Sequence, residues 1–284
     1  MVSKTTDPSK SGNVVAGASF ATPQDGTILA RIGRASVGRL STHMGDIELN
    51  HGTAFVYKQV TDSKAKTSTL YLLTNLHVAT GILDLYPEYL YTLRQSQTIT
   101  DEPAGLKLQL GEHYYRIPTV LAARGEFFKD AASQTKHLDF AFFKLNLSTD
   151  EPQEFFAIPT TWDTQQGAPV FALGFPKDME LSITDGIISH IYGDNPKAPR
   201  NKWTIQHNLL INPGNSGGPT ITPFGHLIGI STKIRTDAIG LNFSLDLQHI
   251  LEYCKDPANL EEIQIEKVIA RLRSRAQEES TYGA

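Results

Sequence analysis

Residues 211–222 read INPGNSGGPTIT, a segment with three glycines, two prolines and a single serine, Ser216. The runs on either side, WTIQHNLLI at 203–211 and HLIGIST at 226–232, are rich in the aliphatic and β-branched residues that favour strands. The segment between them carries no bulky side chain and keeps one hydroxyl group. It fits either a glycine-rich hairpin turn or a turn built around a nucleophilic serine.

The pattern outside this segment predicts an all-β protein. From residue 28 onward, short apolar runs such as LYLLTNLHV, DFAFFKL and PVFALGF recur every ten to fifteen residues and are separated by Gly, Pro, Asn, Asp and Ser. Many short strands with few helical periods are typical of sandwiches and barrels. We expect two β-barrels, at residues 29–150 and 151–245, which divide near the polar stretch at 146–154. Residues 84–103 and 123–137 are expected to be long surface loops.

The two ends of the chain differ from the centre. Residues 1–28, rich in Ser, Thr, Gly and Ala, are expected to be a flexible leader, followed at once by a strand over ILARI. Residues 246–284 are expected to form a carboxy-terminal helical tail. It starts with a short helix over DLQHILEYC, and Asn259 with Glu262 resembles a capping box that would open a second helix.

The second helix would run to about Ala276 and keep one apolar face, made of Leu260, Ile263, Val268, Ile269 and Leu272. Its opposite face would carry Lys267, Arg271, Arg273 and Arg275. This face is either solvated or a surface for an acidic partner. A protein partner or self-association through this helix is therefore one hypothesis for the tail.

The amino-acid composition limits the classes of function that the protein could have. The 284 residues are 40% hydrophobic and 20% charged, and the net charge of −4 gives no reason to expect nucleic acid or a membrane surface as a partner. The only cysteine, Cys254, excludes an intramolecular disulfide and the usual zinc sets, so no metal or other cofactor is expected. No secretory signal or run of about 18 apolar residues is present. We therefore expect a cytoplasmic protein.

A nucleophilic serine needs a base and an oriented carboxylate. Among nine histidines, His77 is the best placed, because it ends the strongly apolar run YLLTNLHV. Asp139 opens the apolar run DFAFFKL, where an unpartnered carboxylate would be costly. Taken singly, His77 could be a hydrogen-bonded core residue and Asp139 an exposed residue at a strand start. The three residues follow one another as His77, Asp139 and Ser216, with the first two in the expected first barrel and the serine in the second. This arrangement favours a shared site between the barrels.

Three segments carry a resemblance to a known family. TNLHV, LDFAFFKL and INPGNSGGP resemble the signature segments of trypsin-fold serine peptidases, specifically the bacterial HtrA/Deg type. HGTAFVY and ALGFP resemble further strands of that family, and the similarity covers roughly residues 34–250. The resemblance implies two six-stranded antiparallel β-barrels with the site between them. HtrA enzymes usually carry a PDZ domain after the peptidase, and this chain is expected to lack one.

The resemblance assigns a role to each matching residue. Ser216 would be the nucleophile, His77 the general base and acid, and Asp139 the residue that orients His77. The backbone N–H groups of Gly214 and Ser216 would form the oxyanion hole, where the loss of one donor costs on the order of a hundredfold in rate. Asn215 stands where digestive relatives have an aspartate, so activation by cleavage of the chain is not expected.

The substrate-binding residues follow from the same resemblance. Ser231 and Thr232 match the strand that pairs with an extended polypeptide substrate, so recognition would be mostly through the main chain. Leu210, Ile211 and Ile234 match pocket walls without an acidic residue, which favours an aliphatic side chain before the cleaved bond.

Two functions remain open from the sequence. The first is a serine endopeptidase, either constitutive or latent until its loops are ordered. The alternative is a catalytically silent peptide-binding or scaffold protein on a protease fold.

Overall fold

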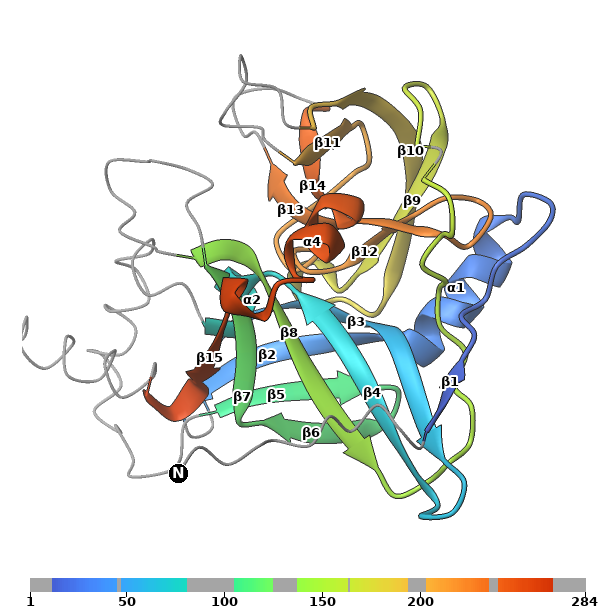
Figure 1. Cartoon of the computed structure of the whole chain (residues 1–284). Coiled ribbons are helices and arrows are strands. Elements are labelled where there is room, and N and C mark those ends of the chain that lie inside the picture. Colours follow the sequence, from blue (N-terminus) through green and yellow to red (C-terminus); the bar gives the residue numbers. More distant parts are fainter. Residues whose placement is uncertain are drawn as a thin grey trace, which may run out of the picture.

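The computed structural model describes residues 12–44, 47–80, 105–124, 137–162, 164–193, 203–234 and 240–267. The chain forms two β-sheet bodies side by side, with short helices at their margins (Figure 1). The predicted all-β fold is therefore confirmed, with one closed barrel and one larger open sheet. The predicted surface loop at 84–103 and most of the one at 123–137 lie outside the described residues.

The first body is a nine-stranded antiparallel sheet, where six strands were expected. Its strands are β1 (Asn13–Val15), β2 (Val37–Met44), β3 (Ile47–Asp62), β4 (Thr67–Thr74), β5 (Gly105–Leu110), β6 (His113–Ile117), β7 (Thr119–Arg124), β8 (His137–Leu147) and β15 (Leu260–Gln264). The hydrogen-bonded path of the described residues runs β15-β7-β8-β4-β3-β2-β5-β6, with β1 added to β3. Only Pro118 separates β6, at one end of this path, from β7, which is next to the strand at the other end.

The second body is a closed six-stranded barrel, as predicted. Its strands are β9 (Pro169–Gly174), β10 (Ser182–Ile191), β11 (Thr204–His207), β12 (Pro219–Ile221), β13 (Leu227–Ile234) and β14 (Asn242–Asp246). They pair antiparallel in the order β10-β11-β14-β13-β12-β9. A short 3-10 turn, η2 (Pro176–Asp178), follows β9. Closure leaves this barrel without a free sheet edge.

The expectation of a flexible leader up to residue 28 is wrong for its described part, residues 12–28. Strand β1 pairs with β3, and the chain then crosses to the second barrel, where Phe20 N–H donates to Phe224 O at 3.0 Å. Helix α1 (Gly26–Ser36) replaces the strand expected over ILARI, and Asp25 caps it by accepting from Thr27 N–H at 2.9 Å. Its buried positions follow the spacing of a helical face: Leu29, Ile32, Gly33 and Ser36.

The carboxy-terminal tail agrees with its prediction only at its start. The short helix is present as α4 (Leu247–Tyr253), capped by Asp246. The capping box at Asn259 and Glu262 is wrong: Asn259 ends the turn η4 (Pro257–Asn259), and Glu262 lies in β15. Strand β15 forms because β7 offers a free edge, whose backbone groups it satisfies. A helix begins at residue 265, and the chain beyond residue 267 lies outside the described residues.

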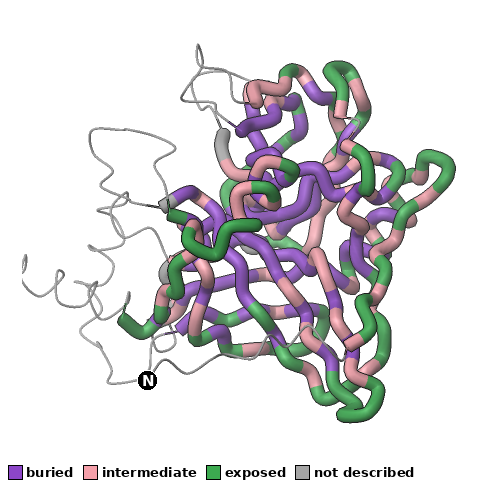
Figure 2. The backbone as a smooth tube through the Cα atoms, in the orientation of Figure 1, coloured by how far each residue is buried: buried purple, intermediate pink, exposed green. Residues whose placement is uncertain are grey.

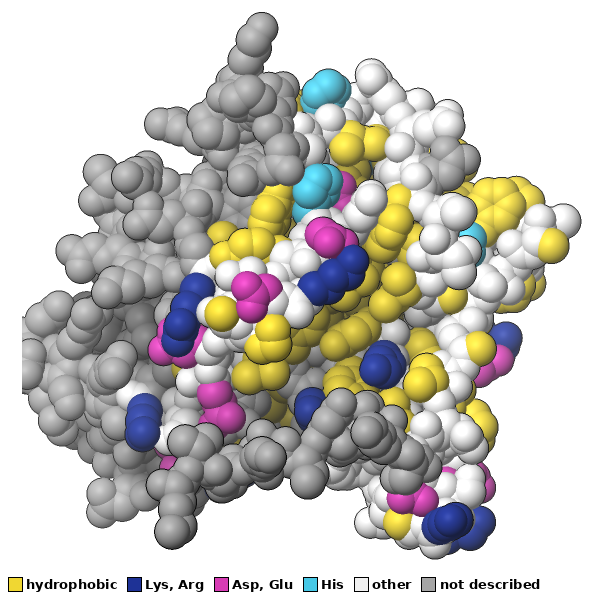
Figure 3. Space-filling view, viewed as in Figure 1, with side chains coloured by type: hydrophobic (Ala, Val, Ile, Leu, Met, Phe, Trp, Pro, Cys, Tyr) yellow, Lys and Arg dark blue, Asp and Glu magenta, His cyan; other side chains and the backbone are white. Residues whose placement is uncertain are grey.

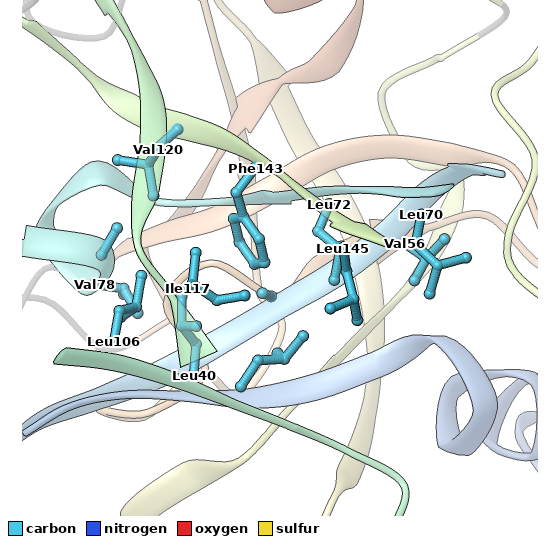
Figure 4. Close-up of a cluster of buried hydrophobic side chains, with 14 of the residues drawn as sticks. Leu40, Val56, Leu70, Leu72, Val78, Leu106, Ile117, Val120, Phe143 and Leu145 are labelled. Atoms are coloured by element: carbon cyan, nitrogen blue, oxygen red, sulfur yellow. The ribbon is translucent and has the colours of Figure 1, made fainter. Parts of the chain in front are cut away.

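Some strands of the first body bury side chains on both faces. Along β4, Leu70 and Leu72 point into the core of the first barrel, and Leu73 points into a second cluster shared with the other barrel. Figure 4 shows the first cluster, which gathers side chains from several strands around Phe143. Exposed positions gather at turns, such as residues 63–66 between β3 and β4 (Figure 2). The site region is therefore carried by strands with little freedom to move.

A pocket of about 290 Å³ lies on the outer surface of this body, under α4 and β15. Figure 3 shows the apolar side chains that gather on this face. The lining residues are Tyr57, Tyr71, Leu121, Phe142, Phe143, Lys144, Leu251, Cys254, Lys255 and Leu260. Burial raises the pKa of the Cys254 thiol to about 12, which keeps it protonated and unreactive at neutral pH. None of the residues expected to do chemistry lines this pocket.

Candidate active site

His77 lies in the short helix α2 (Leu76–Thr80), which starts one residue after strand β4. Amide groups in the first turn of a helix have no acceptor within the helix. The N–H of His77 instead donates to Asp139 Oδ1 at 3.0 Å. The Asn75 side chain donates to the carbonyl oxygen of Asp139 at 2.8 Å. The segment TNLH therefore fixes the backbone of His77 against β8.

The side chains of His77 and Asp139 are in direct hydrogen-bonding contact. His77 Nδ1 lies 2.9 Å from both carboxylate oxygens of Asp139. Thr232, on β13 of the second barrel, donates from Oγ1 to Asp139 Oδ2 at 2.8 Å. The carboxylate thus accepts hydrogen bonds from residues of both barrels. This arrangement fixes the ring orientation of His77 and leaves its Nε2 for another partner.

The electrostatics of the pair favour its charged form. Burial alone would raise the pKa of Asp139, but the charge of His77 and the hydrogen bonds from His77 and Thr232 outweigh it and lower the pKa. Burial would likewise lower the pKa of His77, but the charge and hydrogen bond of Asp139 outweigh it and raise the pKa. His77 is therefore a stronger base than an isolated imidazole.

The glycine-rich segment forms two tight turns around Ser216. Asn215 N–H donates to Asn212 O at 3.0 Å, and Gly218 N–H donates to Asn215 O at 2.9 Å. Gly217 has φ +84, and a Cβ at this position would lie 2.1 Å from the carbonyl oxygen of Thr53. Both the backbone conformation and the close approach require glycine. The lack of side chains in this segment is thus explained by its packing against β3.

The donors of this loop are used unequally. The N–H groups of Asn215, Gly217 and Gly218 all donate to carbonyl oxygens. Within the described part of the chain, the N–H groups of Gly214 and Ser216 donate to no protein acceptor. Gly214 has φ +99, a conformation that L-residues with side chains avoid. These two groups are available to a ligand oxygen.

Ser216 lies close to the His77 helix across Gly52. A Cβ at Gly52 would lie 2.8 Å from Ser216 O and 2.6 Å from a methyl group of Val78, the residue after His77. Asn50 contacts the same helix through a 3.4 Å hydrogen bond from Nδ2 to His77 O. Considering only described residues, the Ser216 hydroxyl makes no hydrogen bond. The structure thus brings the three predicted residues to one region, with His77 and Asp139 in direct contact.

The expected pocket residues occupy different environments. Leu210 is 71% exposed, whereas Ile211 is 6% exposed and packs in the core of the second barrel with Val170 and Ile188. Ile234 ends β13, and its side chain lies outside what the structure describes. Of Leu210 and Ile211, the two whose side chains the structure describes, Leu210 is therefore the one open to a ligand.

Ser231, expected to pair with a substrate, bonds to the Ser216 loop through both of its main-chain groups. Its N–H donates to Gly218 O and its carbonyl oxygen accepts from Gly217 N–H, both at 2.8 Å. These bonds tie β13 to the Ser216 loop and use the Ser231 N–H, so the remaining lone pair of its carbonyl oxygen is what Ser231 could offer an extended peptide. The adjacent Thr232 takes a role that the sequence did not indicate, because its hydroxyl binds Asp139. No local pattern announces this contact, which joins residues 93 positions apart.

A charged cluster packs against the same loop. Arg39 donates two hydrogen bonds of 2.7 Å to Glu48, and His51 Nδ1 lies 3.1 Å from Glu48 Oε1. Burial would raise the pKa of Glu48, but the hydrogen bonds from His51 and Arg39 and the charge of Arg39 lower it to about 2. A Cβ at Gly214 would lie 3.0 Å from His51 Nε2. The cluster thus supports one side of the loop.

The fold and the site geometry together define a class, the two-barrel serine peptidases. A family model described as "Trypsin-like peptidase domain" matches residues 52–230, more than half of the chain. The chain belongs to the trypsin-like peptidase family.

The curated relatives that match are of the HtrA and Deg type. The putative serine protease HhoB of Synechocystis is 38% identical over 87 residues, which is 30% of this chain and 21% of the relative. Protease Do-like 5 of Arabidopsis thaliana, a chloroplastic protein, is 33% identical over 100 residues, 32% of this chain and 31% of the relative. Serine protease HTRA4 of Mus musculus is 32% identical over 122 residues, 42% of this chain and 24% of the relative. Each match thus spans under a third of the relative.

Solved structures agree on the fold. The Rv3671c protease from M. tuberculosis in its active form superposes with a TM-score of 0.51 at 16% identity, over 88% of this chain and 92% of that one. The serine endoprotease from Yersinia pestis gives a TM-score of 0.51 at 20% identity, over 83% and 69% of the two chains. At these identities the likeness shows the fold alone.

Two further observations concern cofactors and membranes. Over the ranges that the structure describes, no group of three or more His, Cys, Asp or Glu side chains could hold a metal ion. In the same ranges, no helix combines the length and the apolar character that crossing a membrane requires.

Proposed function

We propose that this chain is a serine endopeptidase in which Ser216 is the nucleophile, His77 the general base and acid, and Asp139 the residue that orients His77. The observation that carries the proposal is the Asp139–His77 pair, with atoms 2.9 Å apart, beside the loop of Ser216. Membership of the trypsin-like peptidase family supports the same roles. The substrate would be a polypeptide, and no cofactor takes part.

The first half of the reaction forms an acyl-enzyme. Ser216 Oγ attacks the carbonyl carbon of the scissile peptide bond, and His77 Nε2 accepts the hydroxyl proton. The negative charge moves to the carbonyl oxygen, where the N–H groups of Gly214 and Ser216 stabilise it. The C–N bond then breaks, and the leaving amine takes the proton from His77. The product is an ester between Ser216 and the acyl part of the substrate.

The second half releases the acyl group. A water molecule attacks the ester carbon while His77 accepts a proton from it. The second tetrahedral intermediate collapses, and Ser216 Oγ takes the proton back from His77. Throughout both halves, Asp139 stabilises the imidazolium form of His77 without accepting its proton.

Substrate recognition is proposed to be mostly through the main chain. Because Ser231 is bonded to the Ser216 loop, the pairing would begin at Thr232. Leu210, with its 71% exposed side chain, is the apolar residue that would meet the substrate side chain before the cleaved bond, and an aliphatic preference follows from it. Ile211 would support this wall from the core.

Two finer expectations stay predictions. A cytoplasmic location rests on the sequence, and the relatives' printed names include chloroplastic and periplasmic proteases. Self-association or a protein partner at the tail rests on residues beyond 267, whereas the tail up to that point packs on its own barrel through β15.

The proposal is tested by intact mass after incubation with a fluorophosphonate. We expect one adduct on the wild-type protein and none on Ser216→Ala or His77→Ala, with unchanged folding by circular dichroism. Ser63→Ala, in the exposed β3–β4 turn, is the control and should label like the wild type. Labelling of Ser216→Ala would contradict the assigned nucleophile. A folded wild-type protein without an adduct would favour the silent scaffold or a latent site.

A further inference from the structure

Thr53, on β3 of the first barrel, contacts the Ser216 loop through two hydrogen bonds. Its backbone N–H donates to Ser216 O at 2.8 Å. Its side-chain Oγ1 donates to Gly214 O at 2.7 Å. Both bonds end on carbonyl oxygens of the loop that carries the two available N–H groups. One residue therefore restrains the loop on both sides of Asn215.

The hydroxyl of Thr53 also binds a third segment. Oγ1 accepts from the N–H of Phe175, the residue that follows β9, at 3.2 Å. The Thr53 carbonyl oxygen in turn accepts from Thr74 Oγ1 at 2.7 Å. Thr53 is fully buried, so water does not compete for these bonds. A single side chain thus connects β3, the end of β9 and the nucleophile loop.

The space around this hydroxyl is closely filled. A Cβ at Gly174 would lie 3.0 Å from Thr53 Oγ1 and 2.9 Å from the Cα of Asn215. Glycine at 174 therefore lets β9 approach the loop at the point where Thr53 holds it. On the side that faces Gly174, the loop is therefore closely packed against β9.

The bond to Gly214 O matters because of what it restrains. Gly214 has no Cβ and sits at φ +99, so its own sterics leave the peptide between residues 214 and 215 free to rotate. A hydrogen bond to its carbonyl oxygen limits that rotation. This peptide lies between the peptide that carries Gly214 N–H and the peptide that carries Ser216 N–H. Holding it in place therefore limits the rotation of both neighbours about the Cα atoms of residues 214 and 215.

We propose that Thr53 is a positioning residue for the oxyanion hole. Its hydroxyl holds the Gly214–Asn215 peptide so that the N–H groups of Gly214 and Ser216 face the developing oxyanion. Thr53 acts through the loop and does not touch the substrate. The inference rests on the proposed peptidase function and adds a residue that neither the triad nor the glycine pattern contains.

The test compares three variants. Thr53→Val keeps the shape and the backbone bond to Ser216 O but removes the bond to Gly214 O. Thr53→Ser keeps the hydroxyl. Thr61→Val is the matched control, because Thr61 is a buried threonine on the same strand whose Oγ1 donates to a backbone carbonyl, Asn13 O, at 3.3 Å.

We expect Thr53→Val to lower kcat and the fluorophosphonate labelling rate roughly 10- to 100-fold, because small misplacements of preorganised groups have effects of this size. KM should change by less than about threefold, since the oxyanion contacts strengthen in the transition state. Thr53→Ser should restore the rate to within about threefold of wild type, and Thr61→Val should leave it unchanged. Such a pattern separates positioning from a general loss of stability.

Other outcomes overturn the inference. Equal rates for Thr53→Val and wild type would show that the hydroxyl does not position the loop. A loss of rate in Thr61→Val as large as in Thr53→Val would show a general effect of stability. If Thr53→Val does not fold, Thr53→Cys replaces it. Thr53→Cys differs from Thr53→Ser only by a sulfur atom in place of the oxygen atom. Equal rates for Thr53→Cys and Thr53→Ser would then overturn the inference. A folded wild type that never labels would overturn the proposed function itself.

Discussion

Thr232 of the second barrel donates a 2.8 Å hydrogen bond to Oδ2 of Asp139 in the first barrel. The same oxygen lies 2.9 Å from His77 Nδ1. The carboxylate is thus held from both sides, and its geometry depends on how the two barrels pack. This relationship links the stability of the barrel interface to the basicity of His77.

Removing the Thr232 hydroxyl should weaken this link. Thr232→Val leaves one carboxylate oxygen of Asp139 with fewer donors, so Asp139 is expected to move and to orient His77 less well. We expect a fall in kcat of roughly 3- to 30-fold with little change in KM. Residues that hydrogen-bond to a catalytic group without touching the substrate have effects of this order. Steady-state kinetics on a peptide substrate measure it, and Thr232→Ser should recover most of the loss. No change in kcat would mean that His77 alone orients Asp139.

The labelling rate should depend on pH through His77. Asp139 raises the pKa of His77 above the ordinary value of 6.5 for a histidine side chain. Because His77 must be neutral to accept the proton of Ser216, the rate of fluorophosphonate labelling should rise with pH through a midpoint above 6.5. Asp139→Asn should reduce the rate roughly 10⁴-fold at neutral pH. A wild-type midpoint at or below 6.5 would contradict the raised pKa.

Glu48 should contribute to stability in a defined pH window. Its pKa is about 2 in the folded protein against the ordinary value of 4.5 for a glutamate side chain, so folding favours the ionised form. The stabilisation is present above pH 4.5 and is lost as the pH falls towards 2. Glu48→Gln should reduce the free energy of unfolding by about 1–2 kcal/mol at pH 7, after allowance for partial exposure. Urea unfolding at several pH values should show the difference from wild type shrinking in acid, and a constant difference would contradict the assignment.

Two glycines with similar backbone angles should differ in their tolerance of alanine. Gly217 has φ +84 and no room for a side chain, since a Cβ would lie 2.1 Å from Thr53 O. Gly167 has φ +86 and nothing within 4 Å of a Cβ. Gly167→Ala should cost about 1–2 kcal/mol from backbone strain alone. Gly217→Ala should cost several kcal/mol more and abolish labelling, and chemical denaturation of the pair measures the steric part directly. Equal costs would contradict the close packing of the loop on β3.

The packing of the carboxy-terminal segment can be tested at Ile265. Its side chain is 1% exposed and belongs to the core of the first barrel. Ile265→Ala should destabilise the protein by about 2–4 kcal/mol. Ile187→Ala, at a 45% exposed position of β10, is the matched control and should cost under about 1 kcal/mol. A small effect at Ile265 would mean that the tail does not dock on the barrel as β15 requires.

The sequence indicated the parts of this protein that depend on local chemistry. Alternating apolar runs broken by turn residues indicated two β-barrels. A strand that buries one face places an apolar side chain on that face at every second residue. The bare segment around Ser216 signalled a tight loop, since only glycine accepts the conformations and close approaches found at Gly214 and Gly217. His77 and Asp139 could be chosen because each ends or opens a strongly apolar run.

Only the tertiary structure decided the contacts that join distant segments. Residues 259–264 carry a helical pattern, yet residues 260–264 form a strand, because the free edge of β7 satisfies more backbone groups than an isolated helix would. Asp25 caps a helix where a leader was expected, and this helix is stable because the groove between the barrels buries one of its faces. Thr53 and Thr232 gain their roles from partners 161 and 93 residues away. A sequence determines which residues can make such bonds, and packing of the two barrels determines which of them do.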